Sequence, residues 1–360
     1  IVKDNYDFAG MPTTAGSASL AESMPPDDSF QVRRIREAGA IVLAKSNMAE
    51  FAFSPNETIG SRIPGFTRNP YATNRVPAGS SGGTGAAVAA SFGVVGLGTD
   101  TGNSIRGPSS HNALVGIRST IGLTSRDGIV PLAFSHDIGG PMARTVADAV
   151  AVFDVLAGTD PADPTTVEAD SRRAVDYNQF LDANALAAAR IGVVRQIVDR
   201  ESGDPRMRDL LNRALDDLRA AGAQIVDPVI IPMLDETVQF SCRRFRYDIN
   251  AYLATLGPDA PVKTLTEIVE SGGYDRTVRD RIRRGLEESL EDPDIRCAEQ
   301  TDNRRLLAQQ VTGVLADEQL DALVYPTWAN VPRLIGDLRS PGGDNSQVLS
   351  PQTGFPAITV

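Results

Sequence analysis

The sequence predicts an α/β fold, because helical and strand-like segments alternate along it. Residues 29–40, SFQVRRIREAGA, have the apolar spacing of an amphipathic helix, and the strand-like run IVLA follows directly. The run AAVAASF favours a helix, and VVGLGT after it is typical of a short buried strand. At 190–194, RIGVV reads as a strand that precedes a helical pattern from Asp204 to Ala221 and the strand AQIV. Such alternation indicates a sheet covered by helices on both faces.

Further elements follow the same pattern. Residues 144–158, RTVADAVAVFDVLAG, predict a helix that stops at its last glycine. The polar stretch TDPADPTTVEADS then marks an internal boundary. Residues 234–318 read as mostly helical, and DALVYPT at 321–327 returns to strand.

Composition excludes several classes of function. The 360 residues carry a net charge of −11, which argues against a nucleic-acid surface, because phosphate binding needs clustered lysines and arginines. A neutral or cationic small substrate fits better. No run of about 18 apolar residues occurs, so neither a membrane span nor a membrane partner is expected.

Cysteine and histidine usage predicts neither metal nor cofactor. The two cysteines, Cys242 and Cys297, lie far apart without CxxC spacing, and we expect buried free thiols. The two histidines, His111 and His136, are too few for a histidine metal cluster, and we expect both to be structural or surface residues.

The stretch from Pro77 to Pro108 carries the strongest functional signal, because two serine-bearing, glycine-rich turns flank one helix–strand unit. Ser80 and Ser81 lie in the first turn, among glycines that let the backbone approach a ligand. The second turn is TGNS, and successive N–H groups in such a turn can converge on an oxyanion. Ser104 at its end is therefore the candidate nucleophile of an acyl transfer.

Rival motifs fit less well. Gly79 to Gly83 satisfies G-x-S-x-G, which would make Ser81 a nucleophile-elbow serine, but the elbow needs a strand immediately before it and NPYATNRVPA is a loop. A triad with His136 and Asp137 would need two adjacent side chains to point the same way. The glycines also lack the lysine of a phosphate loop, and GLGTDTG misses the Rossmann spacing by one position.

Without histidine, a lysine with a pKa lowered by burial is the remaining kind of base for a serine. Two lysines lie in apolar surroundings, Lys3 after Ile-Val and Lys45 after IVLA. Spacing alone does not choose between them.

Five ordered motifs decide the question by resemblance. KDNYDFAGMPTTAGS, LAKSNMAEFAF, NPYATNRVPAGSSGG, GTDTGNSIRGPS and GPMARTVADAV together resemble the amidase signature family. The match is dense over 1–157, weak over 160–318, and returns in DALVYPT and TGFPAITV. The resemblance implies that Lys3 is the base and Lys45 is structural. It also implies that Ser80 is a bridging serine after a cis Gly79–Ser80 bond, and that Ser104 is acylated.

The family's mechanism passes a proton from Ser104 through Ser80 to Lys3 while Ser104 attacks an amide carbonyl. By resemblance, the backbone N–H groups of the second turn hold the oxyanion, and three neighbours support the turn. The oxyanion residues are Thr101, Gly102, Asn103 and Ser104, and the supporting residues are Ser81, Asp100 and Arg106.

Two positions depart from the family pattern. Asn103 stands where the family commonly has a second glycine before the nucleophile, and Ala78 stands where it usually has glycine. Asparagine tolerates left-handed backbone angles better than most residues, so the oxyanion turn can survive. The alanine puts the geometry of the first loop in question.

The resemblance implies a hydrolase that releases ammonia or an amine from a carboxamide, with LTSRDGIVPLAFSHDIGGPMARTVADAV most similar to peptide amidases and related stand-alone amidases. The alternative is the glutaminase subunit of a tRNA-dependent amidotransferase, which needs partner chains. A more remote alternative is an inactive binding or scaffold protein. The expected partner is a small amide, and a homo-oligomer is compatible with the sequence.

The family's fold is an α/β/α sandwich with a central mixed sheet, which we expect as one domain over 1–360. Residues 1–158 would be the catalytic core, 159–320 a variable, mostly helical substrate-side region, and 321–360 a return to the core sheet. The abrupt ends suggest truncation on both sides. The sequence therefore does not decide the cellular compartment, although the cytoplasm is favoured.

The sequence offers two sets of candidate residues for contact with the substrate. Trp328 could form an aromatic wall, although core packing is favoured. Arg243, Arg244 and Arg246 could bind a substrate carboxylate, although a solvated charged face is favoured.

Overall fold

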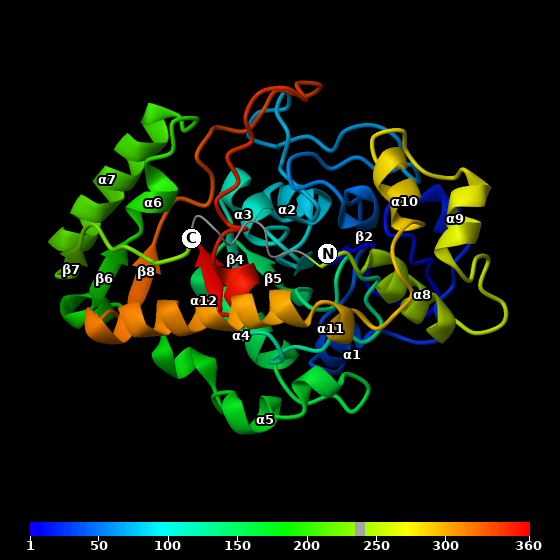
Figure 1. Cartoon of the computed structure of the whole chain (residues 1–360), viewed down its shortest axis with the longest axis horizontal. Helices are drawn as coiled ribbons and strands as arrows, with labels where there is room; N and C mark the ends of the chain where they lie inside the picture. The colour runs from blue at the N-terminus through cyan, green and yellow to red at the C-terminus, as the bar shows by residue number, and fades with distance from the viewer. Residues whose placement is uncertain (235–241) are drawn as a thin grey trace.

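A six-stranded mixed sheet forms the centre of the computed structural model, which describes residues 1–234 and 242–360 (Figure 1). Its first three strands run parallel to one another, and its remaining neighbours pair antiparallel. In spatial order the strands are β2 (Lys45–Ser46), β1 (Val2–Lys3), β3 (Val95–Asp100), β5 (Ile138–Ala143), β4 (Val115–Arg118) and β9 (Ala357–Thr359).

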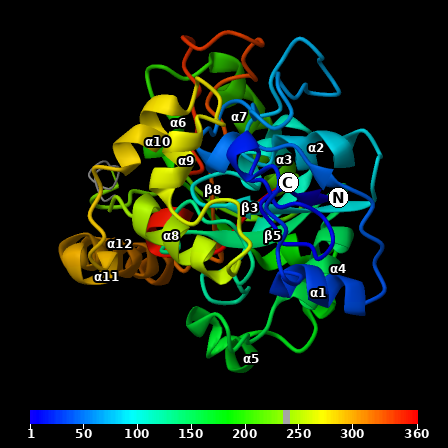
Figure 2. The ribbon, with the colours of Figure 1, turned by 90° about the vertical axis from the view of Figure 1, so that its right-hand side faces the viewer.

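Helices cover both faces of this sheet, as predicted. On one face lie α1 (Phe30–Glu37) and α4 (Val146–Leu156), and on the other lie α2 (Gly82–Ala89) and α3 (Arg106–His111) (Figure 2). Side chains of α1 and α4 pack against Val2 and Leu97 on one face of the sheet. Side chains of α2 and its neighbours pack against Met142 on the other face. The α/β/α sandwich is therefore confirmed.

Local sequence signals place the helix ends well. Thr145 caps α4 by accepting a hydrogen bond from the N–H of Asp148, and Asp204 caps α7 (Pro205–Ala220) in the same way. The strand predicted over IVLA is displaced, because β2 begins only at Lys45. Ile41 and Leu43 are 82% and 65% exposed, so this edge has no buried face to extend the strand.

A second, three-stranded parallel sheet stands beside the first. It consists of β7 (Gln224–Val226), β6 (Arg190–Val193) and β8 (Ala322–Val324). DALVYPT therefore forms its predicted strand, but the strand joins this smaller sheet, and only β9 returns to the six-stranded one. The three residues of β8 pair in parallel with Ile191, Gly192 and Val193 of β6, which places β8 in the smaller sheet.

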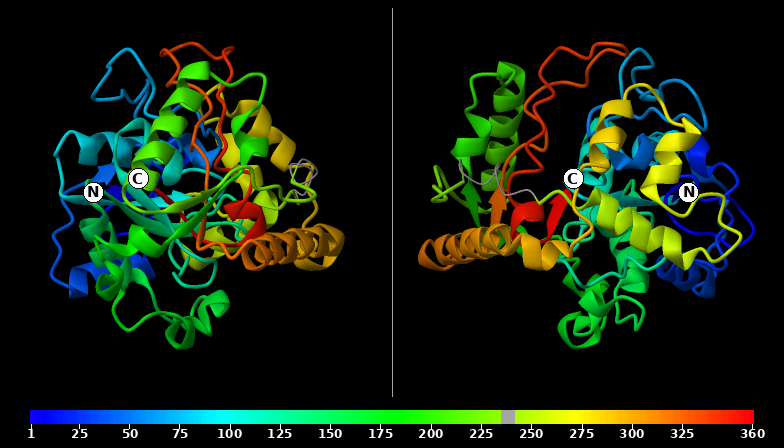
Figure 3. Two further views of the ribbon diagram at one scale, coloured as in Figure 1. Left: turned by 90° about the vertical axis from the view of Figure 1, so that its left-hand side faces the viewer. Right: turned by 45° about the vertical axis from the view of Figure 1, so that its right-hand side comes forward.

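The region after β7 is largely helical, as predicted, except that its residues 235–241 lie outside the described part of the chain. Its longest helix, α12 (Ala298–Asp317), runs past both sheets, and Leu307 and Val311 on it pack against Val194 and Leu349 (Figures 1 and 3). The other helices of this region and the short ones are α5 (Ala169–Arg172), α6 (Arg195–Val198), α8 (Phe245–Thr255), α9 (Leu265–Ser271), α10 (Arg279–Gly285), α11 (Pro293–Arg296) and α13 (Ser350–Thr353). Among the described residues, no helix is long and apolar enough to cross a membrane.

Cys242 and Cys297 form a disulfide, so the prediction of free thiols is wrong. The two residues are 55 positions apart, but their Cα atoms lie 5.9 Å apart, because Cys297 at the end of α11 returns to the segment that precedes α8. Sequence spacing contains no trace of this return.

Replacing both cysteines by serine is expected to lower the unfolding free energy by about 3–4 kcal/mol, because the disulfide restricts a long loop of the unfolded chain. Thermal unfolding with and without a thiol reductant measures this. The double variant serves as the control, since a reductant should not change its melting temperature. An unchanged wild-type melting temperature under full reduction would contradict the expectation.

Candidate active site

Lys3 ends strand β1 and points at the first serine-bearing turn. Its Nζ donates to Ser80 Oγ at 2.7 Å and to Thr99 Oγ1 at 2.7 Å. Lys3 and Ser80 are wholly buried. Burial lowers the pKa of Lys3 to about 7, against the opposing charges of Asp137 and Asp100. The lysine can therefore lose its proton near neutral pH, as a base for a serine must.

The first turn has the backbone geometry that the resemblance implies. The Gly79–Ser80 peptide bond is cis. Ala78 takes a φ of 61°, in the left-handed region that favours glycine, so the turn keeps its geometry although a side chain is present. The cis Gly79–Ser80 bond is thus present in this loop although alanine stands at position 78.

The second turn joins the end of β3 to the start of α3 and carries Ser104. The Ser104 hydroxyl donates to Asn103 Oδ1 at 3.3 Å rather than to Ser80. Asn103 does not need the left-handed conformation that its side chain tolerates, because its φ is negative. Within the described part of the chain, no hydrogen bond uses the amide N–H of Gly102, Asn103 or Ser104, which leaves these donors available to an anion.

A buried ion network supports this turn from behind. Asp100 accepts from Arg106 Nε at 3.0 Å and from Arg118 Nη1 at 3.0 Å, and all three side chains are at most 2% exposed. Burial raises the pKa of Asp100, but the two arginines outweigh it and hold the pKa at about 2. Arg106 also donates to the carbonyl oxygen of Gly102 at 2.7 Å. The predicted pair of Asp100 and Arg106 thus lies where it can fix the turn.

Two further residues considered from the sequence, Ser81 and Lys45, make different contacts. Ser81 accepts from the N–H of Thr99 at 3.3 Å and donates to its carbonyl at 3.2 Å, which fixes the first turn to β3. Lys45 lies in an ion pair with Asp4 at 3.0 Å and donates to Pro12 O at 2.9 Å. Its bonds thus go to the segment after β1 and not to the candidate serines, in agreement with a structural role.

Sequence reasoning missed the contacts of three residues of this site, of which Asp137 entered only as the partner of His136 in a rejected triad. Thr99 is a second acceptor for Lys3, Arg118 is a second cation on Asp100, and Asp137 accepts from the Thr101 hydroxyl at 2.5 Å. Arg118 could have been noticed, because a charge within a buried strand such as VGIR needs a partner. Thr99 and Asp137 gave no signal apart from their position beside glycine-rich strand ends.

The histidines take no part in a serine–histidine couple with the candidate serines. His136 Nδ1 lies 2.7 Å from the Ser135 hydroxyl, whereas the Asp137 carboxylate turns to Thr101. His111 is buried and lies against Trp328, with ring centroids 4.6 Å apart, so this tryptophan packs in the core. In the described ranges, no three His, Cys, Asp or Glu side chains are grouped to hold a metal ion.

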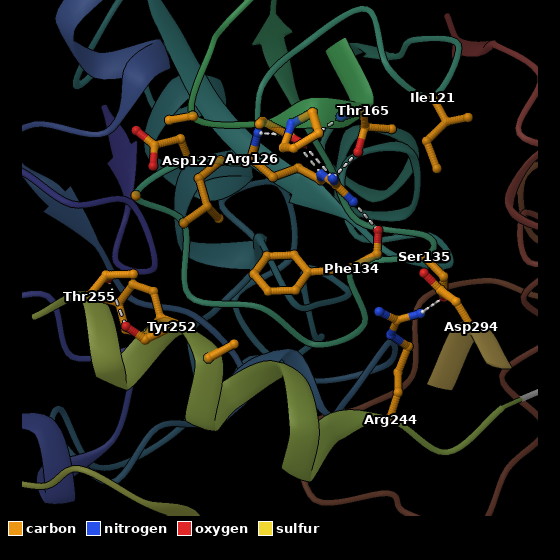
Figure 4. A pocket seen from close by; sticks show the side chains of 16 residues that line it. Ile121, Arg126, Asp127, Phe134, Ser135, Thr165, Arg244, Tyr252, Thr255 and Asp294 are labelled. Carbon is orange, nitrogen blue, oxygen red and sulfur yellow. Dashed lines mark hydrogen bonds and ion pairs between the residues drawn. The ribbon is translucent and has the colours of Figure 1, made fainter. Parts of the chain in front are cut away.

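The predicted solvated face of arginines is wrong for Arg244. This side chain is buried and donates to Asp248 at 2.6 Å and to Asp294 at 3.0 Å, at the rim of a cavity of about 470 Å³ (Figure 4). It lies there because α8 begins directly after it and faces the cavity. Arg246 donates to the carbonyl oxygens of Leu286 and Glu288.

Comparisons with known proteins agree with this geometry. The family model described as Amidase matches residues 1–360. The chain is similar to a glutamyl-tRNA(Gln) amidotransferase subunit from Gloeothece citriformis, with 40% identity over 252 residues, 70% of this chain and 48% of that protein. A homologue of the same name from Acidobacterium capsulatum is 38% identical over 339 residues, 91% of this chain and 68% of that protein. The chain thus spans about half the length of the first of these relatives.

Solved structures give the same result. The native peptide amidase from Stenotrophomonas maltophilia superposes with a TM-score of 0.88 at 37% identity, over 100% of this chain and 74% of that chain. A glutamyl-tRNA(Gln) amidotransferase subunit from Thermotoga maritima gives 0.76 at 31% identity, over 99% of this chain and 74% of that chain. The chain therefore belongs to the amidase family, the amidase signature family that its five motifs resemble.

Proposed function

We propose that the protein hydrolyses the C–N bond of a carboxamide through an acyl-enzyme on Ser104. The observation that carries this proposal is the wholly buried pair of Lys3 and Ser80, joined by a 2.7 Å hydrogen bond. A lysine whose pKa is about 7 can act as a base for a hydroxyl within hydrogen-bond distance. The hydroxyls of Ser80 and Thr99 both lie at 2.7 Å, and the proposal assigns the relay to Ser80.

In the first step, neutral Lys3 takes the proton of Ser80, and Ser80 takes the proton of Ser104. Ser104 Oγ then attacks the amide carbon. The step requires the Ser104 hydroxyl to leave Asn103 Oδ1 and turn toward Ser80. Attack places negative charge on the carbonyl oxygen. The backbone N–H groups that would hold it are those of Thr101, Gly102, Asn103 and Ser104.

In the second step, the proton returns through Ser80 to the leaving nitrogen, which departs as ammonia or an amine. Water then attacks the ester on Ser104, gives its proton to the same relay, and releases the carboxylic acid. The Asp100 network keeps the turn rigid throughout, because Arg106 binds the carboxylate and the Gly102 carbonyl together.

Intact mass spectrometry after incubation with a fluorophosphonate tests the proposal, with peptide mapping of the labelled serine. One adduct on Ser104 is expected. Ser109→Ala is the matched control, because Ser109 on α3 is wholly buried and lies outside the relay, and Ser104 of this variant should still be labelled. A folded chain that acquires no adduct would contradict the proposed function and favour the inactive binding protein.

The main alternative is the glutaminase subunit of a tRNA-dependent amidotransferase, since the curated relatives are named as subunits of a glutamyl-tRNA(Gln) amidotransferase. The solved structure with TM-score 0.88 is instead that of a peptide amidase. Ammonia release from a peptide with an amidated C-terminus, compared with release from free glutamine, separates the two. Faster release from the peptide amide supports the stand-alone amidase.

Asn103→Gly is expected to raise the rate of fluorophosphonate labelling at Ser104 by about two- to tenfold. The variant removes the acceptor that holds the Ser104 hydroxyl away from Ser80, and a typical hydrogen bond contributes about 0.5–1.5 kcal/mol. Time-resolved mass spectrometry gives the rate. A labelling rate below that of the wild type would show that Asn103 assists the reaction.

A further inference from the structure

Asp137 joins two segments that the proposed mechanism treats separately. One of its carboxylate oxygens accepts from the Thr101 hydroxyl at 2.5 Å, in the turn that leads to Ser104. The other accepts from the N–H groups of Leu132 and Ala133, each at 2.9 Å. The buried carboxylate therefore fixes the loop over residues 129–137 to the end of strand β3.

That loop also forms a wall of the 470 Å³ cavity. Figure 4 shows the ring of Phe134 pointing into the cavity, between Arg126 and helix α8. The N–H of Phe134 donates to Asp248 Oδ2 at 2.8 Å, so the loop is held by α8 on one side and by Asp137 on the other. The Asp137 carboxylate thus connects this wall of the cavity to Thr101 through hydrogen bonds.

Asp137 carries a charge that no cation neutralises directly. None of the ion pairs in the described part of the chain includes it, and burial raises its pKa to about 6. Its negative charge opposes the loss of the Lys3 proton more strongly than that of Asp100 does. Charged or titratable groups surround Asp137 on several elements. On strands and helices they are Lys3 (β1), Asp100 (β3), Arg118 (β4) and Asp248 (α8), and in loops they are Arg126 and His136.

We propose that Asp137 is a positioning residue, which holds Thr101, and with it the turn that leads to Ser104, to the cavity-lining loop. The inference rests on the proposed function, because it concerns the activation of Ser104. It assigns two separable effects to one side chain, a geometric effect on the turn and an electrostatic effect on the base.

Labelling of Ser104 by a fluorophosphonate, followed from pH 5 to pH 9, tests both effects. Asp137→Asn keeps an oxygen acceptor but loses the charge, so its acidic midpoint should move to lower pH by at least about half a unit, with a plateau rate within about threefold of the wild type. Asp137→Ala should move the midpoint equally and lower the plateau by at least about tenfold, because Thr101 loses its partner.

Asp160→Asn is the matched control. Asp160 is also buried and accepts from the Ser125 hydroxyl at 2.6 Å and from the N–H of Ala162 at 3.0 Å. The two carboxylates that raise the pKa of Lys3 are instead Asp137 and Asp100. Its variant should keep the wild-type midpoint. If the Asp137 variants do not fold, Thr101→Val supplies the second test, since it removes the hydrogen bond, keeps the charge, and should lower the plateau without moving the midpoint.

Two outcomes would overturn the inference while the proposed function stands. In the first, the wild type is labelled, but the acidic midpoint of its labelling rate equals that of Asp137→Asn. In the second, Asp160→Asn moves this midpoint as far as Asp137→Asn does. A wild-type protein that is not labelled at any pH would instead refute the proposed function, and the inference with it.

Discussion

Replacing Ser104 by alanine is expected to abolish amide hydrolysis, with a fall in kcat of at least about 10⁴-fold. Lys3 and Ser80 would keep their hydrogen bond, but no oxygen would remain where the N–H groups of the second turn converge. Ammonia release from a panel of carboxamides measures the loss. The fold should survive, because within residues 1–234 and 242–360 the Ser104 hydroxyl makes one long hydrogen bond, to its neighbour Asn103.

Ser109→Ala is a suitable control for this experiment. Ser109 lies on α3 only five positions away, is wholly buried and belongs to no part of the relay. Its variant should keep both activity and melting temperature within a small margin. Hydrolysis by Ser104→Ala at a rate near that of the wild type would refute the assignment of the nucleophile.

The features predicted well from sequence are those that depend on local chemistry. The helix of residues 144–158 has its cap and its apolar face within its own segment, and α4 forms there. Lys3, Ser80 and Ser104 belong to motifs whose order along the chain is enough to recognise them. The structure adds the contact between Lys3 and Ser80, which spans 77 positions.

The features that sequence could not supply depend on contacts between distant segments. The disulfide needs the chain to return at the end of α11, and the place of β8 depends on a register with β6, far earlier in the chain. Arg244 reads as one of three surface arginines, but Asp248 and Asp294 bury it. The contact of Asp137 could not be predicted for the same reason, since its partner Thr101 lies 36 positions away at the end of another strand.

Replacing Lys3 by methionine is expected to lower the labelling rate of Ser104 by about 10²- to 10⁴-fold at pH 8, the usual contribution of a general base. The pH dependence gives the sharper result. In the wild type, Lys3 is protonated below its pKa of about 7, so the rate should fall tenfold per pH unit below that value and level off above it. Methionine cannot titrate, so the variant should lose this acidic limb.

Lys45→Met is the matched control, because it removes a second buried lysine that sits outside the relay. Lys45 pairs with Asp4 at 3.0 Å, so its loss should lower the melting temperature and leave an uncompensated carboxylate, while the acidic limb of Ser104 labelling stays in place. The two lysine variants thus separate a base from a structural cation. A Lys3→Met protein that keeps the limb, or labels within about tenfold of the wild type at pH 8, would assign the base to another group.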